Sequence, residues 1–369
     1  MRKSMSGSFL AFFVSTVVLI LLLDGCSDRS PLEDKNTAPR ITSASLVEAA
    51  ADIPFCYTAE VSDPDGPAPV VQFLDYPQWL TAEHDSLTGT PPVGAVDTSF
   101  TVVASDGDLA DTLAVTIQVN PTLVVYGDTR TGHTAHQQVV DQIRAVKPAT
   151  VFHVGDLVNN GLDQSDWDTF NIITADMRAE SEFFPALGNH EYQSPLYFNI
   201  FELPGNEQWY SVTRSYIHFI ILNTCVDISP GSDQYQWLAS ELASIADTVR
   251  FVAAVFHHPP YSTGVHAEDE LGLREKIVPL FEQHGVDIVF TGHDHDYERS
   301  FCGGIYYIVT GGGGAPLRAQ ARSHPCSQLF LQEYHFCRLS IVGDSLRVRV
   351  CDQASVPLDD FSLSRSVSP

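Results

Sequence analysis

The stretch VDIVFTGHDHDYERS, residues 286–300, decides the fold of this chain. It starts with a mainly apolar run of five residues and continues directly into a polar loop with two histidines two residues apart. A short apolar run bounded by turn signals predicts a buried strand, and in open α/β sheets ligands bind at the carboxyl ends of strands. Taken alone, the loop also fits an ordinary polar turn.

Four other apolar segments lead directly into polar loops in the same way. They are LVVY, TVFHV, FFPAL and RFVAAVF, and the loops after them are GDTR (127–130), GD (155–156), GNHE (188–191) and HHP (257–259). Helical patterns lie between most of these segments, and strands that alternate with helices predict an α/β layered domain. Because the carboxyl ends of such strands face one crevice, we expect the five loops to converge there.

The side chains in these loops are of the types that bind transition metals. Carboxylate and amide oxygens mixed with imidazoles suit zinc, manganese or iron. A single Gly-Asp pair carries no information, but five such loops at five strand ends predict a metal centre.

The ordered series GDTR, GDLVNNG, GNHE, FHHPPYS and GHDHDYER resembles the motif set of the calcineurin-like metallophosphoesterase superfamily. FHHPPYS and GHDHDYER make the chain most similar to the purple acid phosphatase branch. The resemblance covers residues 123–310, about half of the chain. It implies an α/β fold, a four-layer α/β/β/α sandwich, with two metal ions at the strand ends. Iron, manganese and zinc all stay open as the implied divalent or trivalent ions.

Position by position, the resemblance implies a ligand set for the two ions. Asp156 would bridge both of them. Three further residues would complete the second ion: Asn189, His257 and His293. Asp128 and His295 would bind the first ion.

The first metal site departs from the family pattern. Purple acid phosphatases place a tyrosine three residues after the bridging aspartate, and here that position is Asn159. Other branches place a histidine two residues after the first aspartate, and here that position is Arg130. Asn159 could supply an oxygen, His133 could reach the ion, or water could fill the place. Without a tyrosinate ligand, we expect the purple charge-transfer colour to be absent.

Three residues are assigned to the substrate side of the site. The resemblance implies that His190 lies near the leaving group and that His258 lies beside the metals or the substrate. A histidine in the position of His190 can hydrogen-bond the phosphate or protonate the leaving oxygen. Arg130 would clamp the phosphate if it points into the crevice, and it would otherwise pair with a neighbouring acid.

The charge balance of the chain is strongly acidic. Its 46 Asp and Glu residues outnumber its 20 Lys and Arg residues, which gives a formal net charge of −26. Such a surface repels polyanions and argues against DNA or RNA as a partner. A small phosphate ester would need local positive charge, and bound metal ions supply it.

These features predict a dinuclear-metal phosphatase that hydrolyses small phosphate esters by attack of a metal-bridging hydroxide. Two alternatives stay open. A phosphodiesterase or nucleotide hydrolase could use the same site. A surface binding protein could carry a structural or decayed metal site, which the missing ligand of the first ion favours. The sequence does not indicate an oligomeric state.

The first 26 residues are typical of an export signal. Arg2 and Lys3 precede an apolar core at residues 9–23, which is short for a membrane span. The sequence LDGC, ending at Cys26, resembles a bacterial lipobox, although Asp24 departs from the small residue usual there. We therefore expect an exported, lipid-anchored protein of the cell envelope, with an uncleaved membrane anchor as the alternative.

Residues 27–37 are expected to form a tether, and residues 38–121 a small all-β domain. The latter resembles the cadherin- and immunoglobulin-like modules of bacterial surface proteins and would act as a spacer. Its acids Asp63, Asp65 and Asp106 would bind calcium or simply stabilise turns. The phosphoesterase domain would span residues 122–352, followed by a flexible tail at 353–369.

Six cysteines remain besides Cys26. Cys302 and Cys326 bracket a glycine-rich loop and could staple it. Cys337 and Cys351 flank a hairpin pattern and would lie opposite one another with a slightly longer turn. Cys56 and Cys225 are expected to be free thiols.

Overall fold

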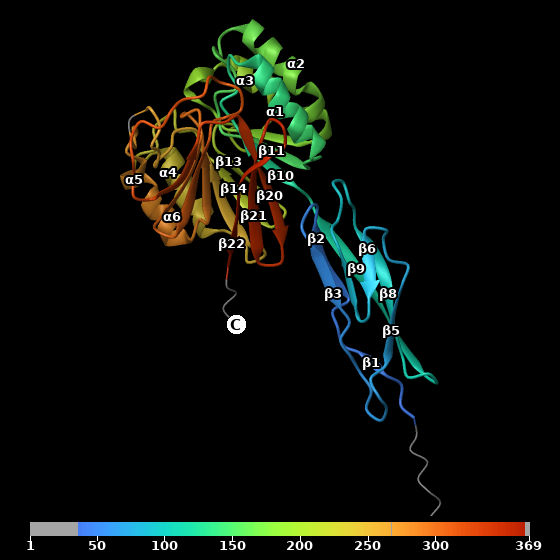
Figure 1. Cartoon of the computed structure of the whole chain (residues 1–369). Coiled ribbons are helices and arrows are strands. Elements are labelled where there is room, and N and C mark those ends of the chain that lie inside the picture. Colours follow the sequence, from blue (N-terminus) through green and yellow to red (C-terminus); the bar gives the residue numbers. More distant parts are fainter. Residues whose placement is uncertain (1–35, 267, 366–369) are drawn as a thin grey trace, which may run out of the picture.

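The computed structural model describes residues 36–266 and 268–365 of the chain. The predicted signal peptide and the proposed lipidation site at Cys26 lie outside these residues, as does most of the tether. Figure 1 shows an elongated all-β domain followed by a larger α/β domain. In the part of the chain that is described, no helix has the length and apolar character needed to cross a membrane.

The N-terminal domain consists of two facing sheets and a short strand pair. The sheets have the strand orders β2-β9-β8-β5 and β3-β7-β6, and β1 pairs with β4. The strands are β1 (Arg40–Ile41), β2 (Leu46–Ala50), β3 (Phe55–Thr58), β4 (Val61–Ser62), β5 (Val70–Leu74), β6 (Leu80–Glu83), β7 (Ser86–Gly89), β8 (Thr98–Ser105) and β9 (Ala110–Asn120). Tyr57 and Phe100 meet edge to face at 5.0 Å between the sheets. The all-β architecture was predicted; its likeness to immunoglobulin modules stays a prediction.

The acids considered for calcium binding lie in turns. One carboxylate oxygen of Asp63 accepts hydrogen bonds from the backbone N–H groups of Asp65 and Gly66. One oxygen of Asp106 accepts from those of Asp108 and Leu109, at 2.8 and 2.7 Å. These contacts match the role of turn-stabilising acids.

The α/β domain is built on two sheets packed face to face. One sheet has the order β12-β11-β10-β20-β21-β22, and the other has the order β13-β14-β15-β16-β18-β17-β19. The strands of the first are β10 (Leu123–Tyr126), β11 (Thr150–His153), β12 (Glu182–Pro185), β20 (His335–Val342), β21 (Ser345–Asp352) and β22 (Pro357–Ser364). Those of the second are β13 (Tyr210–Arg214), β14 (Ile217–Ile221), β15 (Phe251–Val255), β16 (Ile288–Thr291), β17 (Tyr297–Cys302), β18 (Ile305–Thr310) and β19 (Ser327–Leu331).

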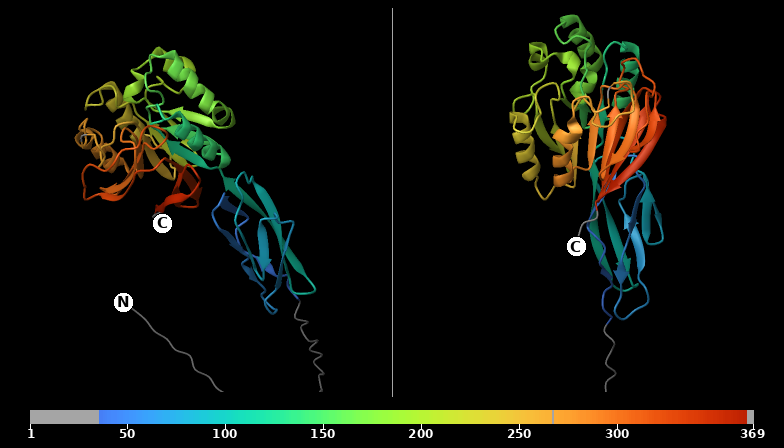
Figure 2. Two further views of the ribbon diagram at one scale, coloured as in Figure 1. Left: turned by 45° about the horizontal axis from the view of Figure 1, so that its top comes forward. Right: turned by 90° about the vertical axis from the view of Figure 1, so that its left-hand side faces the viewer.

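Helices cover the outer faces of both sheets (Figures 1 and 2). Helices α1 and α2 pack on the first sheet through a shared buried cluster, and α4, α5 and α6 pack on the second. The helices are α1 (His133–Ala145), α2 (Gln164–Glu180), α3 (Pro195–Ile200), α4 (Asp233–Ala243), α5 (Leu273–Lys276) and α6 (Val278–His284), with a 3₁₀ turn at Asn189–Glu191. Between the sheets, the rings of Phe152 and Phe219 stack at 3.9 Å. This is the α/β/β/α layering predicted from the sequence.

The parallel strands place the polar loops at one end of the domain. Strands β10, β11 and β12 run parallel in the first sheet, and β14, β15, β16 and β18 do so in the second. The N-terminal domain joins at the amino end of β10, and in both views of Figure 2 it extends away from the α/β domain. The carboxyl ends of the strands therefore lie at the opposite, uncovered edge.

Ion pairs and hydrogen bonds connect the two domains. Arg250 binds both carboxylate oxygens of Glu48 at 2.5 and 2.7 Å, and Arg338 binds Asp52 at 2.6 Å. The side-chain amide of Asn120 donates to the backbone oxygen of Ile341 at 3.1 Å. These contacts hold the N-terminal domain at one orientation.

Two expectations from the sequence are wrong. The predicted flexible tail from residue 353 instead contains β22, which pairs with β21 along its length. Leu363 packs into the core between the sheets, and Arg347 binds Asp360 at 2.6 Å, so apolar burial and ion pairs hold this serine-rich segment. The hairpin of β20 and β21 pairs Cys337 with Val350 and not with Cys351, and both cysteines are free thiols.

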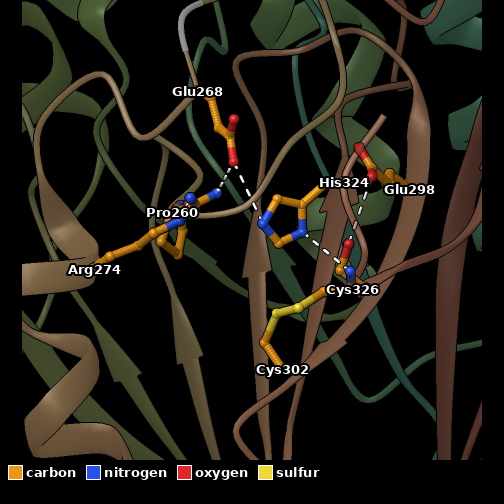
Figure 3. Close-up of a disulfide and its surroundings, with 8 residues drawn as sticks. Pro260, Glu268, Arg274, Glu298, Cys302, His324 and Cys326 are labelled. Atoms are coloured by element: carbon orange, nitrogen blue, oxygen red, sulfur yellow. Dashed lines mark hydrogen bonds and ion pairs between the residues drawn. A yellow bond between two sulfur atoms is a disulfide. The ribbon is translucent and has the colours of Figure 1, made fainter. Parts of the chain in front are cut away.

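The disulfide between Cys302 and Cys326 is present, with 5.5 Å between the two Cα atoms (Figure 3). It joins the end of β17 to the residue before β19 and so closes the glycine-rich loop, as expected. Beside it, His324 lies 3.4 Å from Glu268, which also binds Arg274 at 2.6 Å. The disulfide and this ion-pair group together brace the loops on one side of the site.

Candidate metal centre

The five loops predicted to converge do meet at the carboxyl edge of the sheets. Three of their residues adopt left-handed backbone angles, with φ of 56° at Asp128, 55° at Asp156 and 70° at His293. Such angles are costly for residues other than glycine and often mark functional sites. The glycines allow close approach, since a Cβ on Gly188 would lie 2.3 Å from Asp156 Oδ1, and one on Gly292 would lie 2.1 Å from Asp128 Oδ2.

The second metal subsite, defined as Asp156, Asn189, His257 and His293, has its donor atoms turned toward one another. His257 Nδ1 donates to the backbone oxygen of Val154 at 3.0 Å, so its Nε2 carries a lone pair. That Nε2 lies 3.0 Å from Asn189 Oδ1 and 3.4 Å from Asp156 Oδ1.

The orientation of His293 completes this subsite. Its Nε2 lies 3.2 Å from a carboxylate oxygen of Glu270 and donates to it, which leaves Nδ1 unprotonated. Nδ1 faces His257 Nε2 at 3.2 Å, so two nitrogen lone pairs point at each other. Burial lowers the pKa of both His257 and His293 and keeps them neutral, the form that binds metals. Such a set of facing acceptors fits a bound cation.

The first metal subsite, defined as Asp128, Asn159 and His295 with the shared Asp156, is arranged differently. His295 Nδ1 donates to the backbone oxygen of Pro316 at 2.9 Å, and its Nε2 lies 3.6 Å from Asp128 Oδ1. Burial and the neighbouring Asp156 raise the pKa of Asp128. Between these donors lies a side chain that already carries a positive charge, Arg130.

Arg130 contacts three residues of the first subsite. Its Nε lies 3.3 Å from Asp156 Oδ2, and its two terminal nitrogens lie 3.4 Å from Asn159 Oδ1 and 3.5 Å from His295 Nε2. Asn159 therefore faces the guanidinium group. His133, another residue considered as a replacement ligand, begins helix α1 and is exposed. The residues of the first subsite, as they lie here, do not fit a metal ion.

The two histidines assigned to the substrate side border both subsites. His190 Nδ1 donates to the backbone oxygen of Asn159 at 2.6 Å, and its Nε2 lies 3.8 Å from Asp156 Oδ2. His258 Nδ1 lies 2.8 Å from the hydroxyl of Thr224, and its ring is 4.5 Å from that of His293. Burial lowers the pKa of His258 to about 4, so it is neutral.

A cavity of about 420 Å³ opens beside the second subsite. Asn189 and His258 form its metal-side wall, and Tyr192, Gln193 and Leu271 line it further out. Its size suits a small ligand.

Sequence reasoning assigned no role to Glu191, which supports the bridging residue. Glu191 is fully buried, and its carboxylate accepts hydrogen bonds from the backbone N–H groups of Gly188, Val158 and Asp156 at 2.7, 3.3 and 3.0 Å. It thus joins the Asp156 loop to the Asn189 loop. Burial and the nearby Asp156 raise its pKa, while the three N–H donors oppose that change. Its place directly after His190 in the GNHE motif was the available signal.

His266 is a second residue that supports the site and to which the sequence assigned no role. The ring of His266 stacks on that of His293 at 3.7 Å, and His266 Nδ1 lies 2.9 Å from Asp294 Oδ1. Asp294 also accepts a hydrogen bond from the hydroxyl of Ser262 at 2.5 Å. Asp294 thus fixes the position of His266.

The comparisons with known proteins agree with this geometry. Residues 121–297 match the family model for the calcineurin-like phosphoesterases. The chain is 30% identical over 218 residues to Purple acid phosphatase 18 of Arabidopsis thaliana, covering 52% of this chain and 49% of the relative. It thus spans about half the length of that curated relative.

Two solved structures share the fold. A purple acid phosphatase from yellow lupin (Lupinus luteus) seeds has a TM-score of 0.61 at 19% identity, covering 90% of this chain and 75% of that one. GAP50, described as the anchor in the inner membrane complex of Plasmodium, has a TM-score of 0.56 at 17% identity. The match covers 67% of this chain and 89% of that one. At these identities the likeness concerns the fold alone.

Proposed function

We propose that this protein is an exported, metal-dependent phosphatase that hydrolyses small phosphate esters. The observation that carries the proposal is the second subsite, where Asn189, His257 and His293 turn lone pairs toward one point beside Asp156. The match of residues 121–297 to the calcineurin-like phosphoesterases and the similarity to purple acid phosphatases support it.

When bound, metal ions at such a centre supply a nucleophile at moderate pH and neutralise the oxygens of the phosphate. The side chains around the centre take the remaining tasks. His190 is held by the backbone oxygen of Asn159 through Nδ1, so its Nε2 is directed at the centre. From there, in its doubly protonated form, it donates the Nε2 proton to the leaving oxygen of the ester, a contribution of about 10²–10⁴-fold.

The binding groups lie on both sides of that reaction centre. Arg130 offers the terminal nitrogens of its guanidinium group to the phosphate oxygens, as the sequence predicted for a clamp. His258, held by Thr224, forms the wall between the metal side and the cavity that receives the organic part of the ester.

The cell-envelope location is part of the proposal. The disulfide between Cys302 and Cys326 is typical of an oxidising compartment and supports export. The N-terminal domain, proposed to be immunoglobulin-like, would hold the catalytic domain away from the membrane to which Cys26 is attached by lipid. It joins the α/β domain at the edge opposite the metal centre and leaves the centre open.

A second candidate function is a surface binding protein with a structural metal site. The departure of the first subsite from the family pattern favours it, and GAP50 is a protein of this fold described as an anchor. A phosphodiesterase would use the same residues as the phosphatase and differs only in substrate.

Hydrolysis assays separate these candidates. Purified protein loaded with Mn²⁺, Zn²⁺ or Fe is assayed on p-nitrophenyl phosphate and on bis(p-nitrophenyl) phosphate, with Asp156→Asn as the matched inactive control. Faster turnover of the monoester supports the phosphatase, and faster turnover of the diester supports the phosphodiesterase. Equal and negligible rates for both proteins under all three metals would exclude an enzyme of either kind.

A further inference from the structure

The guanidinium group of Arg130 lies where the first metal ion was expected. Each of its three nitrogens faces a different potential ligand of that ion: Asp156, Asn159 and His295, at 3.3–3.5 Å. The side chain is 15% exposed. Asn159 Oδ1 and His295 Nε2 thus lie within hydrogen-bond distance of a cation that belongs to the chain, and Asp156 Oδ2 lies within ion-pair distance of it.

A metal ion and this guanidinium group compete for the same position. An ion bound to Asp156 and His295 would lie about 2.0–2.2 Å from each donor atom. The flat guanidinium group spans those same atoms, and its charge cannot be removed, because arginine stays protonated in proteins. At such short range in a buried site, repulsion between the two cations is strong.

The charges around the two subsites also argue against a second metal ion. The two carboxylates at the centre of the site are Asp128 and Asp156, and Arg130 offsets one of their charges. The tyrosinate that would add a third negative charge is replaced by the neutral Asn159. With one divalent ion these three side chains and the ion would carry a net charge of about +1, whereas with two ions the net charge would be about +3 in a buried site.

We infer that this protein binds one metal ion, in the second subsite, and that Arg130 replaces the first ion. The guanidinium group then performs the electrostatic task of that ion by facing the phosphate oxygens. The inferred metal content stands on geometry and charge, whereas the role toward phosphate rests on the proposed function. This departs from the two-ion centre that the sequence resemblance implied.

Metal counting tests the inference without an activity assay. The protein is saturated with Mn²⁺, passed through a desalting column, and analysed for bound metal per chain by mass spectrometry. We expect about one ion per chain and a six-line electron paramagnetic resonance spectrum of isolated Mn²⁺. Two ions per chain with the signal of an exchange-coupled pair would overturn the inference, and so would the absence of any retained ion.

Two matched histidine variants locate the ion. His257→Ala removes a ligand of the second subsite and should lose the ion, whereas His295→Ala removes a residue of the first subsite and should retain it. Circular dichroism and thermal unfolding of both metal-free variants check that they fold. Loss of the ion in His295→Ala with retention in His257→Ala would place it in the first subsite and contradict the inference.

A third variant tests whether Arg130 is the residue that excludes the first ion. Arg130→His removes the permanent charge and supplies the imidazole that other family branches have there. We expect its metal content to rise toward two ions per chain, and a content that stays at one would refute the role given to Arg130. Phosphatase activity measured on the same samples is a separate result. A wild-type protein that binds one ion but is inactive would refute the proposed function and leave the inferred metal content standing.

Discussion

The two halves of the metal centre use similar residues and reach opposite arrangements. In the second subsite, His257 and His293 each donate from one ring nitrogen, to the backbone oxygen of Val154 or to the exposed carboxylate of Glu270, and turn the other nitrogen inward. In the first subsite, His295 is fixed in the same manner by Pro316, but its inward nitrogen meets the guanidinium group of Arg130.

The difference between the halves comes from one long side chain. Both halves hold neutral imidazoles and buried carboxylates, so residue type alone would make both of them metal sites. A cation supplied by the chain changes one half into an anion-binding position. The presence of ligand residues therefore does not establish a metal ion until the charge already in the site is counted.

The shared residue Asp156 gives the largest expected effect. Asp156→Asn weakens both halves at once, because Asp156 faces His257 on one side and Arg130 on the other. We expect phosphatase activity to fall by about 10³-fold or more, comparable to the loss of a main electrostatic contact in other enzymes. Steady-state kinetics on p-nitrophenyl phosphate measure this, and activity within tenfold of wild type would contradict the shared role.

The next effect concerns His190, on the side of the first subsite. His190→Ala should lower kcat by about 10²-fold for an alkyl phosphate, since a poor leaving group needs a proton. For p-nitrophenyl phosphate, whose leaving group is a weak base, we expect a much smaller loss. Equal losses on both substrates would show that His190 does not act as the proton donor.

A smaller effect is expected from the support of the second subsite. Asp294→Asn weakens the contact with His266, which stacks on His293, and should lower metal affinity by about 10-fold, the lower end for residues that orient a ligand. Competition with a metal indicator measures the affinity.

Asp296→Asn is the matched control in the same loop. The side-chain oxygens of Asp296 have no hydrogen-bond partner among the described residues, so replacing the carboxyl group by an amide removes no such contact, and burial raises the pKa of this acid. The metal affinity of the Asp296→Asn variant should stay near that of the wild-type protein. Equal losses in both variants would show that disturbance of the loop, and not the His266 contact, controls affinity.

The last prediction concerns stability, and it is a pH dependence that arises behind the first subsite. His153, whose Nε2 lies 3.3 Å from the hydroxyl of Thr129, and the neighbouring His136 are fully buried. Burial lowers the pKa of His136 to about 3 and moves that of His153 in the same direction. Because the unfolded chain binds protons below pH 6.5 and these folded histidines do not, stability should fall as pH drops from 6.5 toward 3.

Each such histidine contributes at most about 1.4 kcal/mol per pH unit to this fall. His136→Phe removes one of the two and should make the decline in the free energy of unfolding less steep. Urea unfolding at several pH values above 4 measures the slope. An unchanged slope in the variant would mean that His136 does not contribute.

The layered α/β fold and the convergence of five loops were predictable from the sequence. The pattern of short apolar strands followed by Asp, Asn and His can be read locally in the sequence. Because the carboxyl ends of parallel strands lie at one edge of a sheet, the loops after these strands are expected to lie close together. The disulfide between Cys302 and Cys326 was also within reach, because the two cysteines bracket one loop. The strand β22 was missed because its sequence is polar and serine-rich, and only its partner β21 stabilises it.

What the sequence alone determined is the set of residues at the centre and the fold that brings them together. Only the tertiary structure decided which nitrogen of each histidine faces inward, because that depends on backbone oxygens such as those of Val154 and Pro316. It also decided the direction of Arg130, which the sequence left open between the phosphate and a neighbouring acid. A long flexible side chain goes where buried charges attract it, and the positions of those charges exist only in the folded chain.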